Sequence, residues 1–345
     1  MSASRSTVNH ARLRTRAQFT LVIAAVACAC ACIVHAAPAD GIEAPQPAHI
    51  AEAWYAHNAV LLMLGAADRI VVTVAKPATF PWMYRVAPVF GHAESVNGST
   101  MNAEELLRRH TDLVFTTPAD PVAPALRRAG LPVVPVNFTD FASMLDCIDL
   151  TARSLGGPLA MQRAAAYRRY LDQTLAEVTA AIGPVAPAQR PRVLHVASLD
   201  PLRIDGADTI IDQWIKAAGG RNAADGLSGN MKVVSIEQVL AWHPDVIIVA
   251  ANGGSLEASP YRSLWDSMEA VRKHRVYRNP SGVFPWDRYG PEVPLQVRWA
   301  ASVLYPDKKP AQPLIDATRG FYATFFAYPL TAPDAQRILD GLAPL

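Results

Sequence analysis

The sequence has little cysteine, no excess of one charge and few charged runs, and each shortage excludes a class of protein. Of four cysteines only Cys147 lies beyond residue 36, so a disulfide framework is not what holds the chain together. Lys and Arg total 32 against 30 Asp and Glu, and no basic run follows the N-terminal segment, which argues against nucleic acid as a partner. A hydrophobic share of 51% over 345 residues excludes disorder and suffices for two domains with cores.

The common motifs of enzymes are also missing. Gly226-Leu227-Ser228-Gly229 falls short of Gly-x-Ser-x-Gly, and the chain has no His-Glu-x-x-His, Gly-x-Gly-x-x-Gly or Walker loop. His92-Ala93-Glu94 resembles the start of a zinc deaminase signature, but that chemistry needs a Pro-Cys-x-x-Cys partner. We therefore expect neither catalysis nor a cofactor, and an exported enzyme of unknown activity is only a distant alternative.

The first 36 residues differ from the rest of the chain. Four arginines precede an apolar run at residues 19–34, and Val34-His35-Ala36 supplies small residues at the positions that a signal peptidase reads. The run is shorter than a membrane span and meets no basic stop. We predict a signal peptide at residues 1–36, cleaved near Ala36, and a periplasmic protein. A lipid anchor on Cys28, Cys30 or Cys32 is the alternative, although the usual Leu-small-small triplet before such a cysteine is missing.

Short β-rich runs alternate with helical patterns along the remaining chain. Parallel strands that are buried on both faces read as brief apolar runs bounded by Gly, Pro, Asp or Ser. Six runs fit this description, at residues 69–74, 112–117, 131–136, 192–197, 245–250 and 275–277. The pattern predicts an α/β protein with mainly parallel sheets.

An internal repeat divides the chain into two similar halves. Residues 102–114 align without gaps on residues 235–247, and each copy places a capping residue before a short helix that leads into a buried strand. Residues 158–182 contain no Gly and, after Pro158, no Pro, which predicts one long helix. We therefore expect an N-terminal lobe at 37–155, a connecting helix at 156–184, and a C-terminal lobe with a helical tail at 185–345.

The chain resembles the class III solute-binding proteins of ABC importers, which carry ferric siderophores, haem, cobalamin and similar metal chelates. The likeness rests on the order of several segments between about residue 50 and residue 342: residues 64–71, both copies of the repeat, and residues 130–133, 210–222, 268–277 and 292–300. The tail at 321–342 resembles an extension in the branch that includes iron-compound, molybdate and nickel-chelate binders. The resemblance implies two α/β lobes joined by a rigid helix, with the ligand between them.

The resemblance also implies a function and its partners. The chain would be the extracytoplasmic component of an importer, a monomer that captures an iron-siderophore-type metal chelate and delivers it to the transmembrane subunits of the ABC permease. The alternative is the same scaffold binding haem, cobalamin, a nickel chelate or a molybdate-type oxyanion. The sequence alone does not choose among these ligands.

Ligand contacts are expected in loops that follow strands, because open α/β sheets bind ligands at the carboxyl ends of their strands. Lys76, Trp82, Tyr84 and Arg85 follow the first predicted strand. Such aromatic and cationic groups can stack on and pair with a flat, anionic chelate. The alternative is that Trp82 and Tyr84 pack beneath the loop.

Three loops of the second half offer the opposite wall. Arg203 follows the predicted strand at 192–197, where it could pair with an oxyanion or with an acid of its own loop. Asn230 precedes the second repeat helix, where helix capping would also explain it. Trp286, Arg288 and Tyr289 repeat the aromatic and cationic chemistry of the first lobe. They are our preferred second wall.

Histidine does not indicate a site for a bare metal ion. His110 and His243 occupy matching places in the repeat, which indicates a structural role. His92 and His195 are the two that could reach the cleft. Two imidazoles fall short of the three or four ligands that Zn²⁺ or Mn²⁺ requires, so we predict no protein-bound metal ion and favour a chelated metal as ligand.

Two acidic residues are candidates for contact with the permease. In the family that the chain resembles, an acid on each lobe, after the strand of the repeat, meets arginines of the transmembrane subunits. The corresponding segments contain Asp120 and Glu257, although Glu is usual where Asp120 stands. For each, an ordinary solvated surface acid is the alternative.

Overall fold

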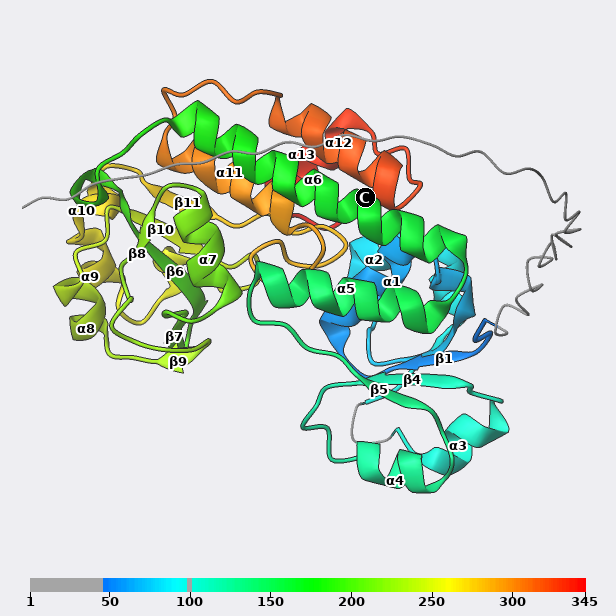
Figure 1. Ribbon diagram of the computed structural model, residues 1–345. Helices are drawn as coiled ribbons and strands as arrows, with labels where there is room; N and C mark the ends of the chain where they lie inside the picture. Colours follow the sequence, from blue (N-terminus) through cyan, green and yellow to red (C-terminus); the bar gives the residue numbers. More distant parts are fainter. Residues whose placement is uncertain (1–45, 98–100) are drawn as a thin grey trace, which may run out of the picture. The chain divides into compact units, whose positions relative to one another are not determined.

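The first lobe is built on a five-stranded parallel sheet, as seen in the computed structural model, which describes residues 46–97 and 101–345 (Figure 1). The strand order is β3-β2-β1-β4-β5. The strands are β1 (Ile50–Glu52), β2 (Ile70–Thr73), β3 (Glu94–Ser95), β4 (Leu113–Thr116) and β5 (Val133–Pro135). The central strand β1 was not predicted, and the predicted signal peptide lies outside the described residues.

Helices cover both faces of this sheet. They are α1 (Tyr55–Leu64), α2 (Pro81–Val86), α3 (Ala103–Arg108), α4 (Ala123–Arg128) and α5 (Phe141–Leu155). Successive strand residues point to opposite faces, so Phe115 of β4 packs with the core that includes α1 and α5, whereas Val114 packs with Leu106 of α3 and Leu126 of α4. Strands buried on both faces explain the unbroken apolar runs in the sequence.

The second lobe has a mixed sheet of order β11-β10-β6-β7-β9, with β8 also paired to β6. The strands are β6 (Arg192–Leu199), β7 (Leu202–Ile204), β8 (Arg221–Asn222), β9 (Lys232–Val233), β10 (Val246–Val249) and β11 (Val276–Arg278), and the helices are α7 (Ile210–Ala217), α8 (Ile236–Ala241), α9 (Arg262–Asp266) and α10 (Glu269–Arg272). Strands β8, β10 and β11 run parallel to β6, but β7 and β9 are in antiparallel pairings. The prediction of mainly parallel sheets therefore holds in the first lobe and needs this qualification in the second.

The long helix α6 (Pro158–Ile182) connects the two lobes, and the helix predicted from the sequence is thus present. Pro158 occupies the first helical turn, where its missing N–H costs nothing, and the helix ends at Gly183, whose φ of 71° suits glycine. The tail forms α11 (Val293–Leu304), α12 (Leu314–Phe325) and α13 (Ala332–Leu339). Residues of both lobes and the tail share one hydrophobic core around α6. The lobes and the tail belong to one compact unit, Glu43–Leu345.

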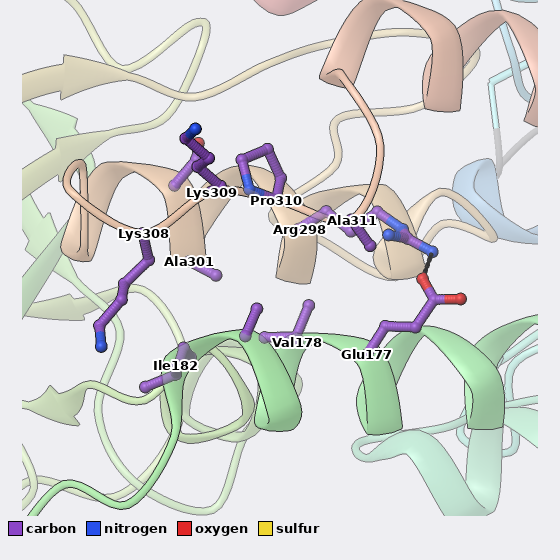
Figure 2. Close-up of a pocket in the computed structure, with 11 residues that line it drawn as sticks. Glu177, Val178, Ile182, Arg298, Ala301, Lys308, Lys309, Pro310 and Ala311 are labelled. Carbon is purple, nitrogen blue, oxygen red and sulfur yellow. Dashed lines mark hydrogen bonds and ion pairs between the residues drawn. The ribbon is translucent and has the colours of Figure 1, made fainter.

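A small cavity lies where α6 faces α11 and the loop at 308–311 (Figure 2). Val178, Ile182 and Ala301 line it, and Arg298 of α11 bonds Glu177 of α6 at 2.6 Å beside it. Its volume of about 30 Å³ would hold about two water molecules. We therefore look elsewhere for a ligand site. None of the helices in the described ranges is long and apolar enough to cross a membrane.

Candidate functional site

A cleft of about 730 Å³ lies between the two lobes. Residues after β1 and β2 line one side, residues at the ends of β6, β10 and β11 line the other, and the C-terminal segment after α13 completes the wall. The lining includes Tyr55, Phe80 and Trp82 of the first lobe, Met231, Phe284, Asp287 and Arg288 of the second, and Leu342 of the tail. This location, at the carboxyl ends of strands, is the one that the topology predicts.

Aromatic side chains dominate the first-lobe side of the cleft. The ring of Phe80 lies 5.8 Å from that of Tyr55 and stacks at 5.3 Å on Phe284 of the second lobe, with an interplanar angle of 22°. Trp82 is nearly buried, and its Nε1 donates to the carbonyl oxygen of Leu342 at 2.8 Å. Because Trp82 is buried, the rings of Tyr55 and Phe80, which are exposed and partly exposed, are the ones that offer apolar faces to a flat or aromatic ligand.

Three large apolar side chains in the cleft remain open to solvent. Tyr55 is 45% exposed, Met231 is 46% exposed and Leu342 is 46% exposed. They come from α1, from the loop before β9 and from the tail, and the fold brings them to one cleft. Because covering exposed apolar surface is favourable, a ligand with an apolar face would gain affinity here.

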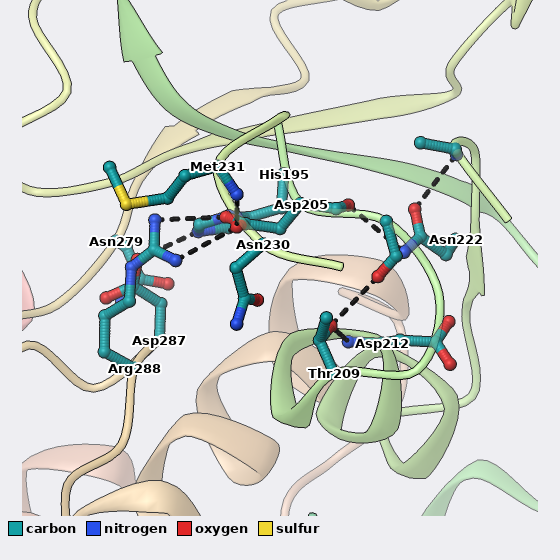
Figure 3. A network of polar contacts seen from close by, with 12 residues as sticks. His195, Asp205, Thr209, Asp212, Asn222, Asn230, Met231, Asn279, Asp287 and Arg288 are labelled. Carbon is teal, nitrogen blue, oxygen red and sulfur yellow. Dashed lines mark hydrogen bonds and ion pairs between the residues drawn. The ribbon is translucent and has the colours of Figure 1, made fainter. Parts of the chain in front are cut away.

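A buried carboxylate, Asp205, organises the charged wall of the cleft (Figure 3). It accepts hydrogen bonds from His195 Nδ1 at 2.8 Å, from the backbone N of Met231 at 2.8 Å and from Arg288 Nη1 at 3.1 Å. Burial alone would raise the pKa of Asp205, but the hydrogen bond from His195 and the charges of His195 and Arg288 hold it well below its usual range. Asp205 therefore stays ionised and fixes both Arg288 and the backbone of Met231, whose φ is 52°.

A second carboxylate, Asp287, lies on the other side of the same imidazole. Its Oδ2 is 3.0 Å from His195 Nε2 and 3.6 Å from Arg288 Nε, at ion-pair distance, and both of its carboxylate oxygens are buried without a hydrogen-bond partner among the described residues. Burial would lower the pKa of His195, but the hydrogen bond to Asp205 and the charges of Asp287 and Asp205 raise it. Two carboxylates thus face one guanidinium and one imidazole, so the wall carries no surplus positive charge.

The first-lobe residues expected to contact ligand are only partly brought to the cleft. Trp82 lines it. Lys76 is exposed and bonds Asn97 through Nζ at 2.8 Å, while Tyr84 packs on the core and donates to the carbonyl oxygen of Ala75 at 2.9 Å. Arg85 is exposed in the last turn of α2, and none of these three is among the residues that line the cleft.

The second-lobe expectations divide in the same way. Arg288 lines the cleft. Asn230 donates to the hydroxyl of Tyr289, and neither of these two is among the residues that line the cleft. Trp286 differs from the expected wall residue, because it is fully buried and its Nε1 donates to Glu292 at 2.9 Å. Arg203 lies half-buried on β7, where it pairs with Ser198 of the cleft wall, but it is not itself among the residues that line the cleft.

Three residues, Glu52, His57 and Tyr55, were not predicted to matter for the site, because strand β1 was not predicted. Glu52 ends β1, and its Oε2 accepts from His57 Nδ1 at 2.5 Å, while His57 Nε2 contacts Thr151 Oγ1 at 2.8 Å, all fully buried. Burial alone would lower the pKa of His57, but the Glu52 carboxylate raises it to about 9. The two ring nitrogens of His57 thus join Glu52 of β1 to Thr151 of α5. Tyr55 itself follows β1, so recognising that strand would have pointed to it.

The other expected sites are placed as follows. His92 is exposed and His195 lies beneath the cleft wall; over residues 46–97 and 101–345, no group of three or more His, Cys, Asp or Glu side chains is arranged to hold a metal ion. Glu257 is exposed in a 3₁₀ turn. Asp120 is half-buried, and its Oδ1 accepts from the backbone N of Val122 at 3.0 Å.

Comparison with known proteins places this architecture in context. The family described as periplasmic binding protein matches residues 51–282. An uncharacterised ABC transporter substrate-binding lipoprotein, YvrC, of Bacillus subtilis is 25% identical over 270 residues, which cover 76% of this chain and 81% of that protein. The molybdate-binding protein MolA of Haemophilus influenzae is 26% identical over 147 residues, which cover 42% of this chain and 41% of that protein.

Solved structures share the fold. A periplasmic solute binding protein of Veillonella parvula superposes with a TM-score of 0.74 at 25% identity, covering 86% of this chain and 93% of that one. MolA bound to molybdate gives 0.70 at 20% identity, covering 83% and 96%. The vitamin B12 binding protein BtuF of Vibrio cholerae gives 0.61 at 20% identity, covering 76% and 98%. The α/β fold with two lobes is thereby confirmed.

Proposed function

The chain belongs to the periplasmic binding protein family, and from this premise we propose that it captures a metal chelate in the interlobe cleft and delivers it to an ABC permease. The observation that carries the proposal is the cleft of about 730 Å³ with aromatic walls from both lobes. Small-molecule sites commonly have volumes of about 300–1,000 Å³ and mostly apolar walls with a few polar groups. His195 is held between two carboxylates, and Ser198 of the cleft wall donates to the carbonyl oxygen of Asp200 rather than to a base, so we propose binding without turnover.

The charge of the walls supports a chelate over a free oxyanion. Arg288 is the one cationic side chain among the described residues that line the cleft, and Asp205 and Asp287 already neutralise it. A small dianion such as molybdate, which MolA binds, would need several unpaired N–H donors in a much smaller space. An iron-siderophore-type chelate without a large net negative charge fits better, and haem, cobalamin or a nickel chelate is the alternative.

Titration of the purified protein tests this proposal. Ferric chelates, haemin, vitamin B12, nickel–histidine and sodium molybdate are added separately while tryptophan fluorescence is recorded, because Trp54 and Trp82 lie at or near the cleft. We expect saturable, one-to-one quenching by a chelate at micromolar concentration, and a smaller signal from Trp82→Phe. Native mass spectrometry of protein purified from the periplasm would identify a retained ligand. Binding of molybdate alone, or of none of these compounds, would contradict the assignment.

We propose that a signal peptide at residues 1–36 directs the protein to the periplasm and is cleaved near Ala36. The arginines and the apolar run that motivate this lie at residues 1–36. N-terminal sequencing of the mature protein should find a start close to residue 37. An intact Met1 would contradict export by this route, and a lipid on Cys28, Cys30 or Cys32 would favour the anchored alternative.

We also propose that Asp120 and Glu257 contact the permease. Reversing both to Lys should leave ligand affinity unchanged, since neither lines the cleft, while uptake by the intact importer collapses because interface attraction becomes repulsion. Asp120→Asn with Glu257→Gln is the matched control, because Asn keeps the oxygen that accepts from Val122 N and adds no positive charge. Normal uptake by the double Lys variant would show that both are ordinary surface acids.

A further inference from the structure

The C-terminal segment Gly341–Ala343 forms part of the cleft wall, although it is distant in sequence from every other lining residue. It follows α13 and lies beyond residues 51–282, which match the family, so the family likeness gives it no role. We infer that this segment is a wall of the ligand site and that Leu342 is a specificity-determining contact for an uncharged, apolar face of the ligand. The inference rests on the proposed function, because it assigns a wall to the same cleft.

Hydrogen bonds fix the backbone of the segment on both sides. The carbonyl oxygen of Leu342 accepts from Trp82 Nε1 at 2.8 Å, and its N donates to the carbonyl oxygen of Arg337 at 2.8 Å. Arg337 Nε in turn donates to the carbonyl oxygen of Ala343 at 2.7 Å. Both backbone polar groups of Leu342 are thus satisfied, and its apolar side chain is the part left for another molecule.

Gly341 sets the direction in which the segment leaves α13. Its φ of 68° favours glycine, and a Cβ built there would lie 2.9 Å from the carbonyl oxygen of Asn279, just after β11. A side chain at this position would strain the backbone and push the segment off the second lobe. The turn therefore holds Leu342 against Trp82 of the first lobe.

The exposure of Leu342 distinguishes it from an ordinary chain end. It is 46% exposed while lining a cleft whose other open apolar side chains, Tyr55 and Met231, come from different lobes. Leu345, three residues later, is 91% exposed and is absent from the residues that line the cleft. The two leucines are three positions apart and only Leu342 lines the cleft, so Leu345 is a matched control for substitution at Leu342.

The test uses Nile red, an uncharged, flat aromatic dye whose emission rises in apolar surroundings. We expect saturable binding to the wild-type chain. Leu342→Asp places a carboxylate against the dye and should weaken binding at least about tenfold, and Leu342→Ala should weaken it about threefold by removing apolar contact. Leu345→Asp should bind as the wild type does. Because Leu342→Ala adds no charge, it remains informative even if the Asp variant disturbs folding, which circular dichroism would reveal.

Other results would overturn the inference. Equal affinity of the Leu342 variants and the wild type would show that the segment is not a ligand wall, and so would a wild-type protein that gives no saturable signal. The proposed function fails separately: if no metal chelate binds but Nile red still distinguishes Leu342→Asp from Leu345→Asp, the wall stands and the chelate assignment falls. If a chelate binds all variants equally, the function stands and the wall falls.

Discussion

A buried carboxylate, Glu292, holds the loop that carries Phe284 to the cleft, and Glu292→Gln tests its protonation. The side chain accepts from Val283 N at 3.1 Å, Phe284 N at 2.8 Å, Trp286 Nε1 at 2.9 Å and Tyr322 Oη at 2.5 Å. Gln replaces one oxygen by an NH₂ group that can only donate, among groups that also donate. We expect this mismatch to reduce the free energy of unfolding by about 1–3 kcal/mol at pH 5.

The pH dependence is the sharper readout. Burial raises the pKa of Glu292 from 4.5 to about 7, although hydrogen bonds from Tyr322 and the loop lower it. Since the folded-state pKa lies above the unfolded value, the stabilisation is full below pH 4.5 and is lost as pH rises through 7. The difference between the two pKa values corresponds to about 3 kcal/mol. Gln cannot titrate, so the variant should lack this fall in stability and approach the wild type above pH 7.

Urea unfolding followed by tryptophan fluorescence between pH 5 and pH 8 gives the required free energies. Glu104→Gln, at an exposed position in α3, is the control and should keep the wild-type pH profile. If the Glu292→Gln profile instead runs parallel to that of the wild type over the whole range, the carboxylate does not titrate there and the reasoning from burial is refuted.

Two further substitutions probe buried contacts. The Glu52 carboxylate raises the folded-state pKa of His57 to about 9, so the stabilisation from this pair is full below pH 6.5 and is lost as pH rises through 9. In the urea assay, His57→Gln should therefore lower the free energy of unfolding at pH 6 and flatten its dependence on pH between 6.5 and 9. A Cβ on Gly282 would lie 2.0 Å from the Tyr322 hydroxyl, whereas one on Gly320 would meet nothing within 4 Å. Calorimetry should therefore show a Tm lowered by several degrees for Gly282→Ala and not for Gly320→Ala; equal Tm values would contradict the contact.

Much of the architecture followed from local patterns. Strands such as β10 are buried on both faces and therefore read as unbroken apolar runs. The helix α6 could be bounded because Pro158 and Gly183 act through backbone geometry that needs no tertiary partner. The position of the cleft followed as well, since parallel strands direct the loops after them to one edge of each sheet.

The sequence did not reveal β1, because Ile50-Ala51-Glu52 ends in a charged residue and lacks the apolar run that marks strands such as β4 and β10. Its stability comes from pairing with β2 and β4 on both sides, which is a tertiary property. Because β1 was not predicted, the buried Glu52–His57 pair and the exposed ring of Tyr55 were not predicted either. An acid or imidazole is normally expected at the surface, and only the fold shows that each of these two groups is buried against the other.

The walls of the cleft were decided by tertiary structure in the same way. Trp286 and Arg288 are two positions apart, and both were expected to line the cleft. In the fold, Trp286 turns into the core toward Glu292, whereas Arg288 turns toward Asp205. Leu342 reaches the cleft through a hydrogen bond to Trp82, a residue 260 positions away. Local composition carries no signal for such contacts, because they depend on where the chain returns after it has folded.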